Sequence, residues 1–248
     1  LVFLMMFIII LRLQRDHKRL KAKLKETHDH LEQMVEARTL NLRQAGQAVS
    51  ESIDYASRLQ RGLLPSPRTL EDALGKVAVF WQPKDVVGGD FYWFGRIGTA
   101  RVLVIMDCTG HGVPGAFMTI LAHSVIEQIC SNHNAVFRVG NKPPNPASIL
   151  KEMHDGIIRL LHRNQNERSE NDRSQNGLDA AVVVLPEDED QISFAGAMID
   201  LYVVPPGEPT KRYQGNRVSL GYGQYNLPTL KKISLPIQSG HSYILSTD

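Results

Sequence analysis

The sequence contains little cysteine and almost no net charge. Only two of its 248 residues are cysteines, Cys108 and Cys130, and their spacing fits neither a metal site nor a disulfide framework. The 28 Lys and Arg residues nearly balance the 26 Asp and Glu residues, which gives a formal net charge of +2. Overall charge therefore predicts no nucleic-acid partner. The hydrophobic content of 42% is sufficient for the packed core of one domain of ordinary size plus an extension.

Charged residues are missing from the first eleven positions. Residues 1–11 form an unbroken apolar run, which is shorter than the roughly 20 residues that a membrane-crossing helix needs. Basic residues crowd the segment that follows: Arg12, Arg15, Lys18, Arg19, Lys21, Lys23 and Lys25. By the positive-inside rule, we interpret residues 1–11 as the end of a transmembrane helix in the bacterial inner membrane, with the rest of the chain in the cytoplasm. A buried N-terminal helix is the alternative.

Proline and strand-like alternation are both absent between Arg12 and Leu64. Apolar residues there recur mostly three, four or seven positions apart: Leu20, Leu24, Leu31, Met34, Val35, Leu42, Val49, Ile53 and Leu59. A stripe this narrow on a long charged helix predicts a coiled-coil signalling helix over residues 12–52, and hence a homodimer. A single solvated helix is the alternative. Gly46 costs about 1 kcal/mol relative to Ala inside a helix, so we expect a hinge or a phase change of the helix near it.

The most distinctive stretch runs from Val104 to Met118. Its apolar start predicts a short buried strand that ends at Asp107. Three glycines and a proline follow within eight residues, so the chain must turn sharply before a helical pattern begins at Ala116. A carboxylate at a strand end beside a glycine-lined turn suits a metal or phosphate site, although a tight strand–helix connection would have the same pattern.

A second carboxylate, Asp90, follows two glycines in Val86-Val87-Gly88-Gly89-Asp90-Phe91-Tyr92-Trp93. This segment, the Asp-x-x-Gly-His-Gly at 107–112, the amphipathic segment at 55–65 and the final Ser246-Thr247-Asp248 occur in a fixed order. In these motifs the chain resembles, from about Ile53 to its last residue, the SpoIIE-type branch of the PP2C-like, metal-dependent protein serine/threonine phosphatases. The resemblance implies a regulatory helix at 53–67 and a phosphatase domain at 68–248 that is incomplete at its C-terminus.

The pattern of elements after Pro65 and Pro67 agrees with that fold. Two helical stretches, 114–131 and 146–163, interrupt a series of short strand-like segments. The expected strands are Val77–Trp81, Phe91–Phe94, Val102–Met106, Ala180–Leu185, Gln191–Ala195, Leu201–Val204, Lys231–Leu235 and Ser242–Ser246. Strands in two groups with helices outside predict an α+β fold, a PP2C-like β-sandwich flanked by helices.

The resemblance also implies the chemistry of the site. Asp90, Asp107 and Asp248 match the family's metal-binding positions, and Asp90 and Asp107 are expected to be the catalytic pair. The carbonyl of Cys108 falls where the family often contributes a backbone oxygen. Oxygen ligands suit two hard divalent cations, Mn²⁺ or Mg²⁺, which would activate a water molecule for attack on phosphorus.

Other residues of the motifs are expected to support this site from outside the set of metal ligands: Asp179, His111, Gly89 and Gly110. Asp179 could instead be a direct ligand. His111 could donate a proton to the leaving serine oxygen or orient the turn. The sequence departs from the family's pattern at Asn176, where Asp is more usual.

The resemblance implies hydrolysis of phosphoserine or phosphothreonine on a signalling protein, with an anti-sigma-factor antagonist of the STAS type as the specific candidate. A catalytically silent scaffold of the same fold, which binds a phosphoprotein, is the alternative. Gly88-Gly89-Asp90-Phe91 superficially resembles the Gly-Gly-Asp-Glu-Phe of diguanylate cyclases, but no Glu follows Asp90 and the later motifs have no place in a cyclase.

Overall fold

The computed structural model describes residues 2–137, 143–161, 176–187, 190–222 and 227–247. The chain divides into two compact units, Leu1–Ser52 and Ile53–Asp248. Asp248 itself lies outside the described residues, so the structure does not test its expected role as a metal ligand.

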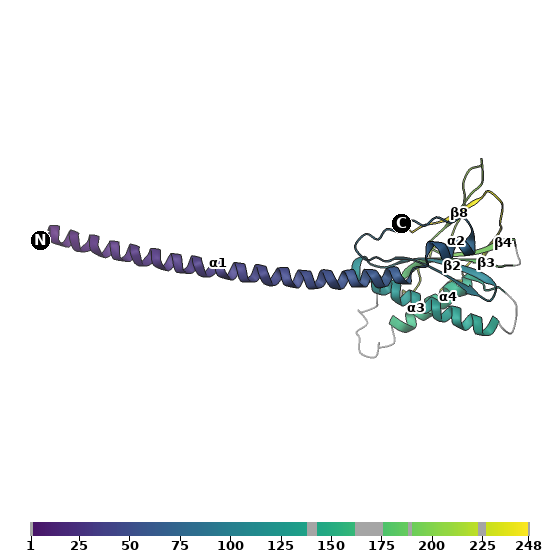
Figure 1. The fold of residues 1–248 in the computed structure, drawn as a ribbon, viewed down its shortest axis with the longest axis horizontal. Coiled ribbons are helices and arrows are strands. Elements are labelled where there is room, and N and C mark those ends of the chain that lie inside the picture. The colour runs from purple at the N-terminus through teal and green to yellow at the C-terminus, as the bar shows by residue number, and fades with distance from the viewer. Residues whose placement is uncertain (1, 138–142, 162–175, 188–189, 223–226, 248) are drawn as a thin grey trace. The chain divides into compact units, whose positions relative to one another are not determined.

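The first unit is helical throughout its described length. Helix α1 spans Val2–Leu63 and begins in this unit (Figure 1). Its apolar stripe is uncovered in the single chain, with side chains from Leu20 to Val49 between 44% and 73% exposed. The helix is continuous through Gly46. Long runs of good helix formers on both sides outweigh the modest cost of one glycine.

One described helical segment, Gly112–Ala135, is long and apolar enough to cross a membrane. Half of its most apolar window is buried inside the second unit, as in the core helix of a globular domain. The start of α1 is not among the described segments that are both long and apolar enough.

The second unit contains two antiparallel sheets. The larger has the strand order β1-β2-β3-β4-β7, and the smaller has the order β6-β5-β8. Their bounds are β1 Asp90–Ile97, β2 Ala100–Cys108, β3 Leu178–Leu185, β4 Gln191–Ala197, β5 Leu201–Val204, β6 Lys211–Tyr213, β7 Ile233–Pro236 and β8 Ser242–Leu245. Three further helices are α2 (Pro67–Leu74), α3 (Gly112–Phe137) and α4 (Pro146–Leu161).

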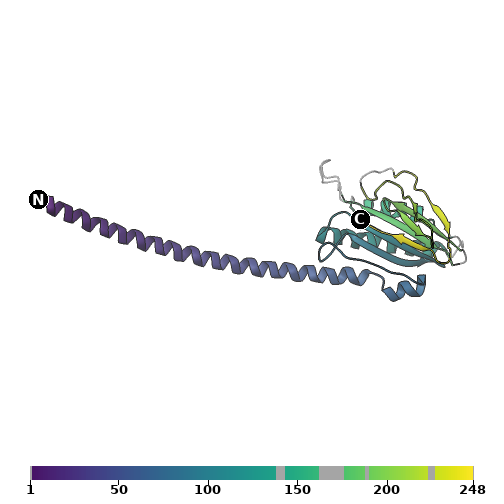
Figure 2. The same ribbon diagram turned by 90° about the horizontal axis from the view of Figure 1, so that it is seen from above.

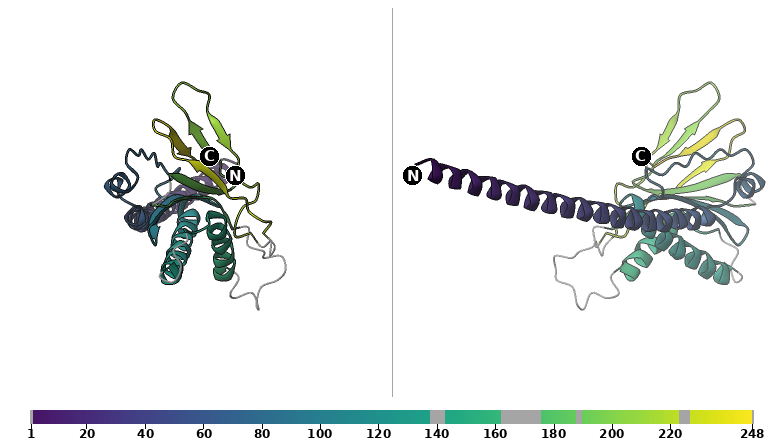
Figure 3. Two further views of the ribbon diagram at one scale, coloured as in Figure 1. Left: turned by 90° about the vertical axis from the view of Figure 1, so that its right-hand side faces the viewer. Right: turned by 60° about the vertical axis from the view of Figure 1, so that its left-hand side comes forward.

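The larger sheet is covered on both faces. Helix α3 packs on β1 and β2, and α4 packs on β3 and β4; Figure 3 shows the two helices together on one face, and Figure 2 shows the strands from above. Alternation along β2 sends Val102, Val104, Met106 and Cys108 into the core under the helices. Leu103 and Ile105 point to the opposite face, where they pack against the second core that the smaller sheet covers.

The α+β sandwich expected from the sequence is confirmed, with three local corrections. Val77–Trp81 has no regular secondary structure, and Phe80 is 90% exposed. Its β-branched and aromatic composition suits a strand, but a strand also needs a neighbour to pair with. Helix α2 and strand β6 were not expected. Helix α2 had a local signal, because the Ser66 hydroxyl caps the Thr69 N–H at 3.1 Å and Pro67 occupies the first turn.

Candidate active site

Three aspartates lie in one row across neighbouring strands. The registers pair Asp90 of β1 with Asp107 of β2, and Asp107 with Asp179 of β3. Side chains that are directly opposite in antiparallel strands share a face, with Cβ atoms about 4.5–5.5 Å apart. Like charges in that arrangement destabilise a sheet unless a cation lies between them. The row therefore brings Asp90 and Asp107 together as expected, and places Asp179 beside them.

A tight glycine turn borders this row. The Cys108 N–H donates to the Gly89 carbonyl at 3.0 Å, and a Cβ on Gly89 would lie 2.3 Å from the Cys108 carbonyl oxygen and 2.8 Å from that of Gly110. Gly110 has a φ of +94° and Gly112 a φ of +63°, which is the left-handed region that favours glycine. Backbone therefore packs directly on backbone here, and two carbonyl oxygens gather beside the residue that precedes Asp90.

The donor set fits a hard divalent cation. Asp90 Oδ1 is buried and has no hydrogen-bond partner among the described residues, which is costly for a carboxylate oxygen without a cation. The nearby groups are carboxylates and carbonyls, the ligands that Mg²⁺ and Mn²⁺ prefer. Within the described ranges, however, no three His, Cys, Asp or Glu side chains converge closely enough to hold a metal alone. Backbone carbonyls or Asp248 would have to complete the coordination.

The Cys108 thiol is separate from this chemistry. Its side chain is 2% exposed and lies in the core under α3 and α4, whereas Asp107 points to the other face of β2. Burial, and then the negative charges of Asp107 and Asp90, raise the pKa of this thiol far above its ordinary value. Cys108 therefore stays protonated and can serve the site only through its backbone.

His111 is held by a residue that sequence reasoning missed. Its Nδ1 lies 2.8 Å from Oδ2 of Asp85, and both side chains are about half exposed or more. Asp85 belongs to the loop before Gly88, and no motif marks it because the pair forms only when that loop folds back on the glycine turn. The contact orients the His111 ring at the edge of the site.

Thr109 and Tyr222, which the sequence analysis also did not single out, connect two strands beside the site. The Thr109 N–H donates to the Gly177 carbonyl at 2.9 Å, and the Gly177 N–H donates to the Thr109 hydroxyl at 3.1 Å. That hydroxyl is also 2.7 Å from the Tyr222 hydroxyl. These hydrogen bonds connect the end of β2 to the start of β3 and so help to keep Asp179 directly opposite Asp107.

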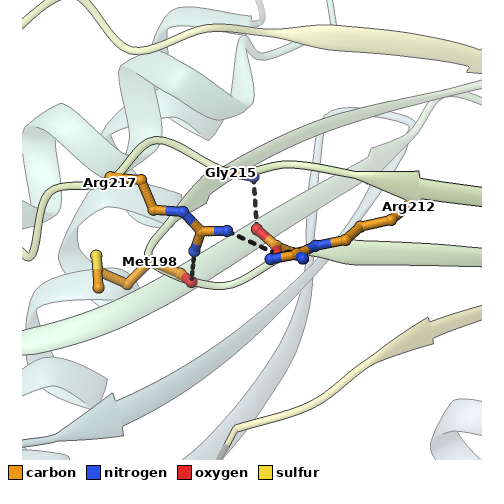
Figure 4. Close-up of polar contacts among 5 residues, drawn as sticks. Met198, Arg212, Gly215 and Arg217 are labelled. Carbon is orange, nitrogen blue, oxygen red and sulfur yellow. Dashed lines mark hydrogen bonds and ion pairs between the residues drawn. The ribbon is translucent and has the colours of Figure 1, made fainter.

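Asp200 lies outside the aspartate row and stabilises the fold through hydrogen bonds and ion pairs. Its carboxylate accepts from the Gly215 N–H at 2.8 Å, from Arg212 Nε at 2.6 Å and from Arg217 at 2.9 Å (Figure 4). Burial alone would raise the pKa of Asp200, but these bonds together outweigh it and hold the pKa below its ordinary value. Arg217 also donates to the carbonyl of Met198, which has a φ of +66°.

Comparison with known proteins identifies the fold and its family. The family model for stage II sporulation protein E (SpoIIE) matches residues 98–248. The chain belongs to the SpoIIE family. The SiaA-PP2C domain of Pseudomonas aeruginosa is 35% identical to this SpoIIE-family chain, with a TM-score of 0.65, and the match covers 82% of this chain and 73% of that one.

A second solved structure resembles the chain less closely. The PP2C phosphatase domain of SpoIIE from Bacillus subtilis, solved with a fragment of its regulatory domain, is 17% identical with a TM-score of 0.43, covering 62% of this chain and 39% of that one. No curated protein matches this SpoIIE-family chain. The SpoIIE family model and the SiaA-PP2C domain together support a phosphatase fold of the PP2C type for this chain.

Proposed function

We propose that this chain hydrolyses phosphoserine or phosphothreonine on a signalling protein with the help of two divalent cations, Mn²⁺ or Mg²⁺. The observation that carries the proposal is the row of Asp90, Asp107 and Asp179 beside the glycine turn, with a buried and unpartnered oxygen on Asp90. A row of carboxylates beside backbone carbonyls supplies the oxygen ligands that these cations prefer.

The residues of the candidate site have distinct roles in this reaction. Asp90, Asp107 and Asp248 would hold the cations, together with the carbonyl of Cys108. When bound, the cations would supply an activated water and neutralise the phosphoryl oxygens. Asp179 supports Asp107 from the neighbouring strand. Gly89 and Gly110 allow the close backbone approach that leaves the carbonyls available.

The setting of the activity is also a proposal. We place the protein at the bacterial inner membrane, with the second unit in the cytoplasm, because apolar residues 1–11 precede a strongly basic segment. The exposed stripe of α1 supports a homodimer through a coiled coil over 12–52. Family membership supports a phosphoprotein substrate, for which a STAS-type anti-sigma-factor antagonist is the specific candidate.

The direct test is phosphate release by the full-length protein from a STAS-domain protein phosphorylated on serine. We expect turnover that requires Mn²⁺ or Mg²⁺ and falls by at least about 100-fold in Asp107→Asn, since each metal ligand is essential to the shared site. Asp155→Asn, the same change at an exposed position on α4, should leave the rate unchanged.

A different result would favour the scaffold function. If the full-length protein binds the phosphorylated STAS protein but releases no phosphate with either cation, the proposed catalysis is wrong and phosphoprotein binding is the better account.

A further inference from the structure

The cluster of Asp200, Arg212 and Arg217 lies at the same edge of the larger sheet as the aspartate row. Strand β4 ends at Ala197, and the next residue, Met198, forms a bridge with Ala180, which directly follows Asp179. The sheet order places this bridge on the side of β3 that is away from β2. Neighbouring strands are about 4.8 Å apart, so the Met198 backbone lies roughly 10 Å from that of Asp107. Arg217 Nη1 donates to the Met198 carbonyl at 2.9 Å, which holds this guanidinium at that distance from the row.

Two guanidinium groups share one carboxylate in this cluster. Arg212 and Arg217 both contact Oδ2 of Asp200, from opposite sides in Figure 4. The Asp200 side chain is only 6% exposed, whereas the side chains of Arg212 and Arg217 are 53% and 43% exposed. One negative charge cannot neutralise two positive charges, so the cluster keeps a net positive charge. The part of it that solvent reaches belongs to the two arginines.

The arginines retain hydrogen-bond donors. Arg212 uses Nε and Nη2 on Asp200, and its Nη1 has no partner among the described residues. A guanidinium carries its N–H donors in a fixed plane that matches the two oxygens of a carboxylate. Because Asp200 and the Met198 carbonyl already fix these side chains, a bound anion would cost little additional ordering.

The surrounding chain adds positive charge. Residues 209–247 contain no Asp or Glu, and their Lys and Arg side chains are all exposed: Lys211, Arg212, Arg217, Lys231 and Lys232. Asn216 joins two parts of this stretch to the end of β4. Its N–H and Nδ2 donate to the Gly196 carbonyl at 2.7 and 2.8 Å, and its Oδ1 accepts from the Lys231 N–H at 3.0 Å. This local excess of one sign contrasts with the near balance of the whole chain and favours an acidic partner.

From this placement we propose that Arg217 and Arg212 form a specificity site, which binds an acidic side chain of the phosphoprotein close to its phosphoserine. The proposal rests on the proposed function, in which the phosphoserine is held at Asp90 and Asp107. An extended chain advances about 3.3 Å per residue, so roughly 10 Å corresponds to an acidic residue about three positions from the phosphoserine.

The test compares two phosphoserine peptides as substrates of the full-length protein in Mn²⁺. One peptide carries glutamate three positions before and three positions after the phosphoserine, and the other carries glutamine at both positions. We expect kcat/KM to be about 5- to 10-fold higher for the glutamate peptide, a modest factor because the ion pair stays half exposed. The difference should lie mainly in KM. In Arg217→Gln the preference should fall to about 2-fold or less, because one of the two cations is gone.

Three further variants separate recognition from stability. Asp200→Asn removes the carboxylate but leaves both guanidinium groups, so it should lower thermal stability without raising the KM for the glutamate peptide. Arg217→Lys keeps the charge and should keep part of the preference. Arg212→Gln should also reduce the preference, and it serves as the test if Arg217→Gln fails to fold. The matched control is Arg159→Gln, the same change at an exposed position of α4, which should leave the preference unchanged.

The outcomes are distinguishable. Equal kcat/KM for the two peptides in the unaltered protein, or a preference that persists in Arg217→Gln and Arg212→Gln, would overturn the specificity site alone. A rise in KM in Asp200→Asn as large as that in Arg217→Gln would do the same, because it would show a purely structural role. Hydrolysis of the phosphorylated STAS protein but of neither peptide would also overturn it. If none of these substrates is hydrolysed with Mn²⁺ or Mg²⁺, the proposed function is wrong and this inference with it.

Discussion

Replacing Gly89 by alanine should damage the site through a single methyl group. A Cβ at this position would lie 2.3 Å from the Cys108 carbonyl oxygen and 2.8 Å from that of Gly110. Both obstacles are backbone atoms of a turn that is itself packed on Gly115, so no side chain can swing away. Overpacking of this kind typically costs 1–3 kcal/mol, and we expect Gly89→Ala to lose about 3 kcal/mol of unfolding free energy.

Gly62→Ala is the matched control, because it makes the same change within the same unit of the chain. Gly62 lies near the end of α1, is exposed, and has no atom within 4 Å of a new Cβ. Alanine is the better helix former, so the free energy of unfolding of this variant should rise by up to about 1 kcal/mol.

Urea unfolding of both variants measures these two changes of opposite sign. Mn²⁺ titration should show weaker binding in Gly89→Ala only, because the clash pushes the Cys108 carbonyl and Asp90 apart. Gly89→Ala with the stability and Mn²⁺ affinity of the unaltered protein would refute the close packing of the turn on this loop.

Three further predictions concern single side chains. The free energy of unfolding of Asp200→Asn should be about 2 kcal/mol lower near neutral pH, because the hydrogen bonds to the charged carboxylate are lost. Because the folded-state pKa of Asp200 is lowered, the unaltered protein should lose this stabilisation as pH falls below about 4, and urea unfolding should show a smaller acid loss in the variant. His111→Gln, which can still donate to Asp85, should reduce kcat less than His111→Ala; equally large losses would instead assign His111 a proton transfer. Thr109→Val should lower the free energy of unfolding by about 1 kcal/mol, and it should lower kcat because Asp179 is held less firmly. A variant with the kcat and stability of the unaltered protein would contradict that link.

The strands and helices were largely predictable because their signals are local. Strand β5 has the predicted bounds, Leu201–Val204, and β2 and β3 extend their predictions by a few residues at their ends. Helix α2 had its own local signal in Ser66 and Pro67, which the prediction overlooked. Val77–Trp81 shows the limit of such signals, because composition suits a strand while pairing depends on what lies next to it in space.

The candidate site could be predicted only where motifs marked it. Asp90 and Asp107 stand in the motifs that carry the family resemblance, and the sheet register places them opposite each other. Two contacts near the site could not be found in this way, because each joins segments far apart in sequence. The buried Gln60 of α1 donates from Nε2 to the Gly88 carbonyl at 2.7 Å, and Asp85 contacts His111. A buried glutamine on an amphipathic helix shows no periodicity that separates it from an exposed one.

The most direct test of the central claim is the thermal stability of the full-length protein and of Asp107→Asn, each measured in EDTA and in Mn²⁺. If the aspartate row is a cation site, Mn²⁺ at about 100 times its dissociation constant should stabilise the unaltered protein by about 2.7 kcal/mol and raise its Tm. In Asp107→Asn that rise should disappear. An equal rise in both proteins, or none in the unaltered one, would contradict the account.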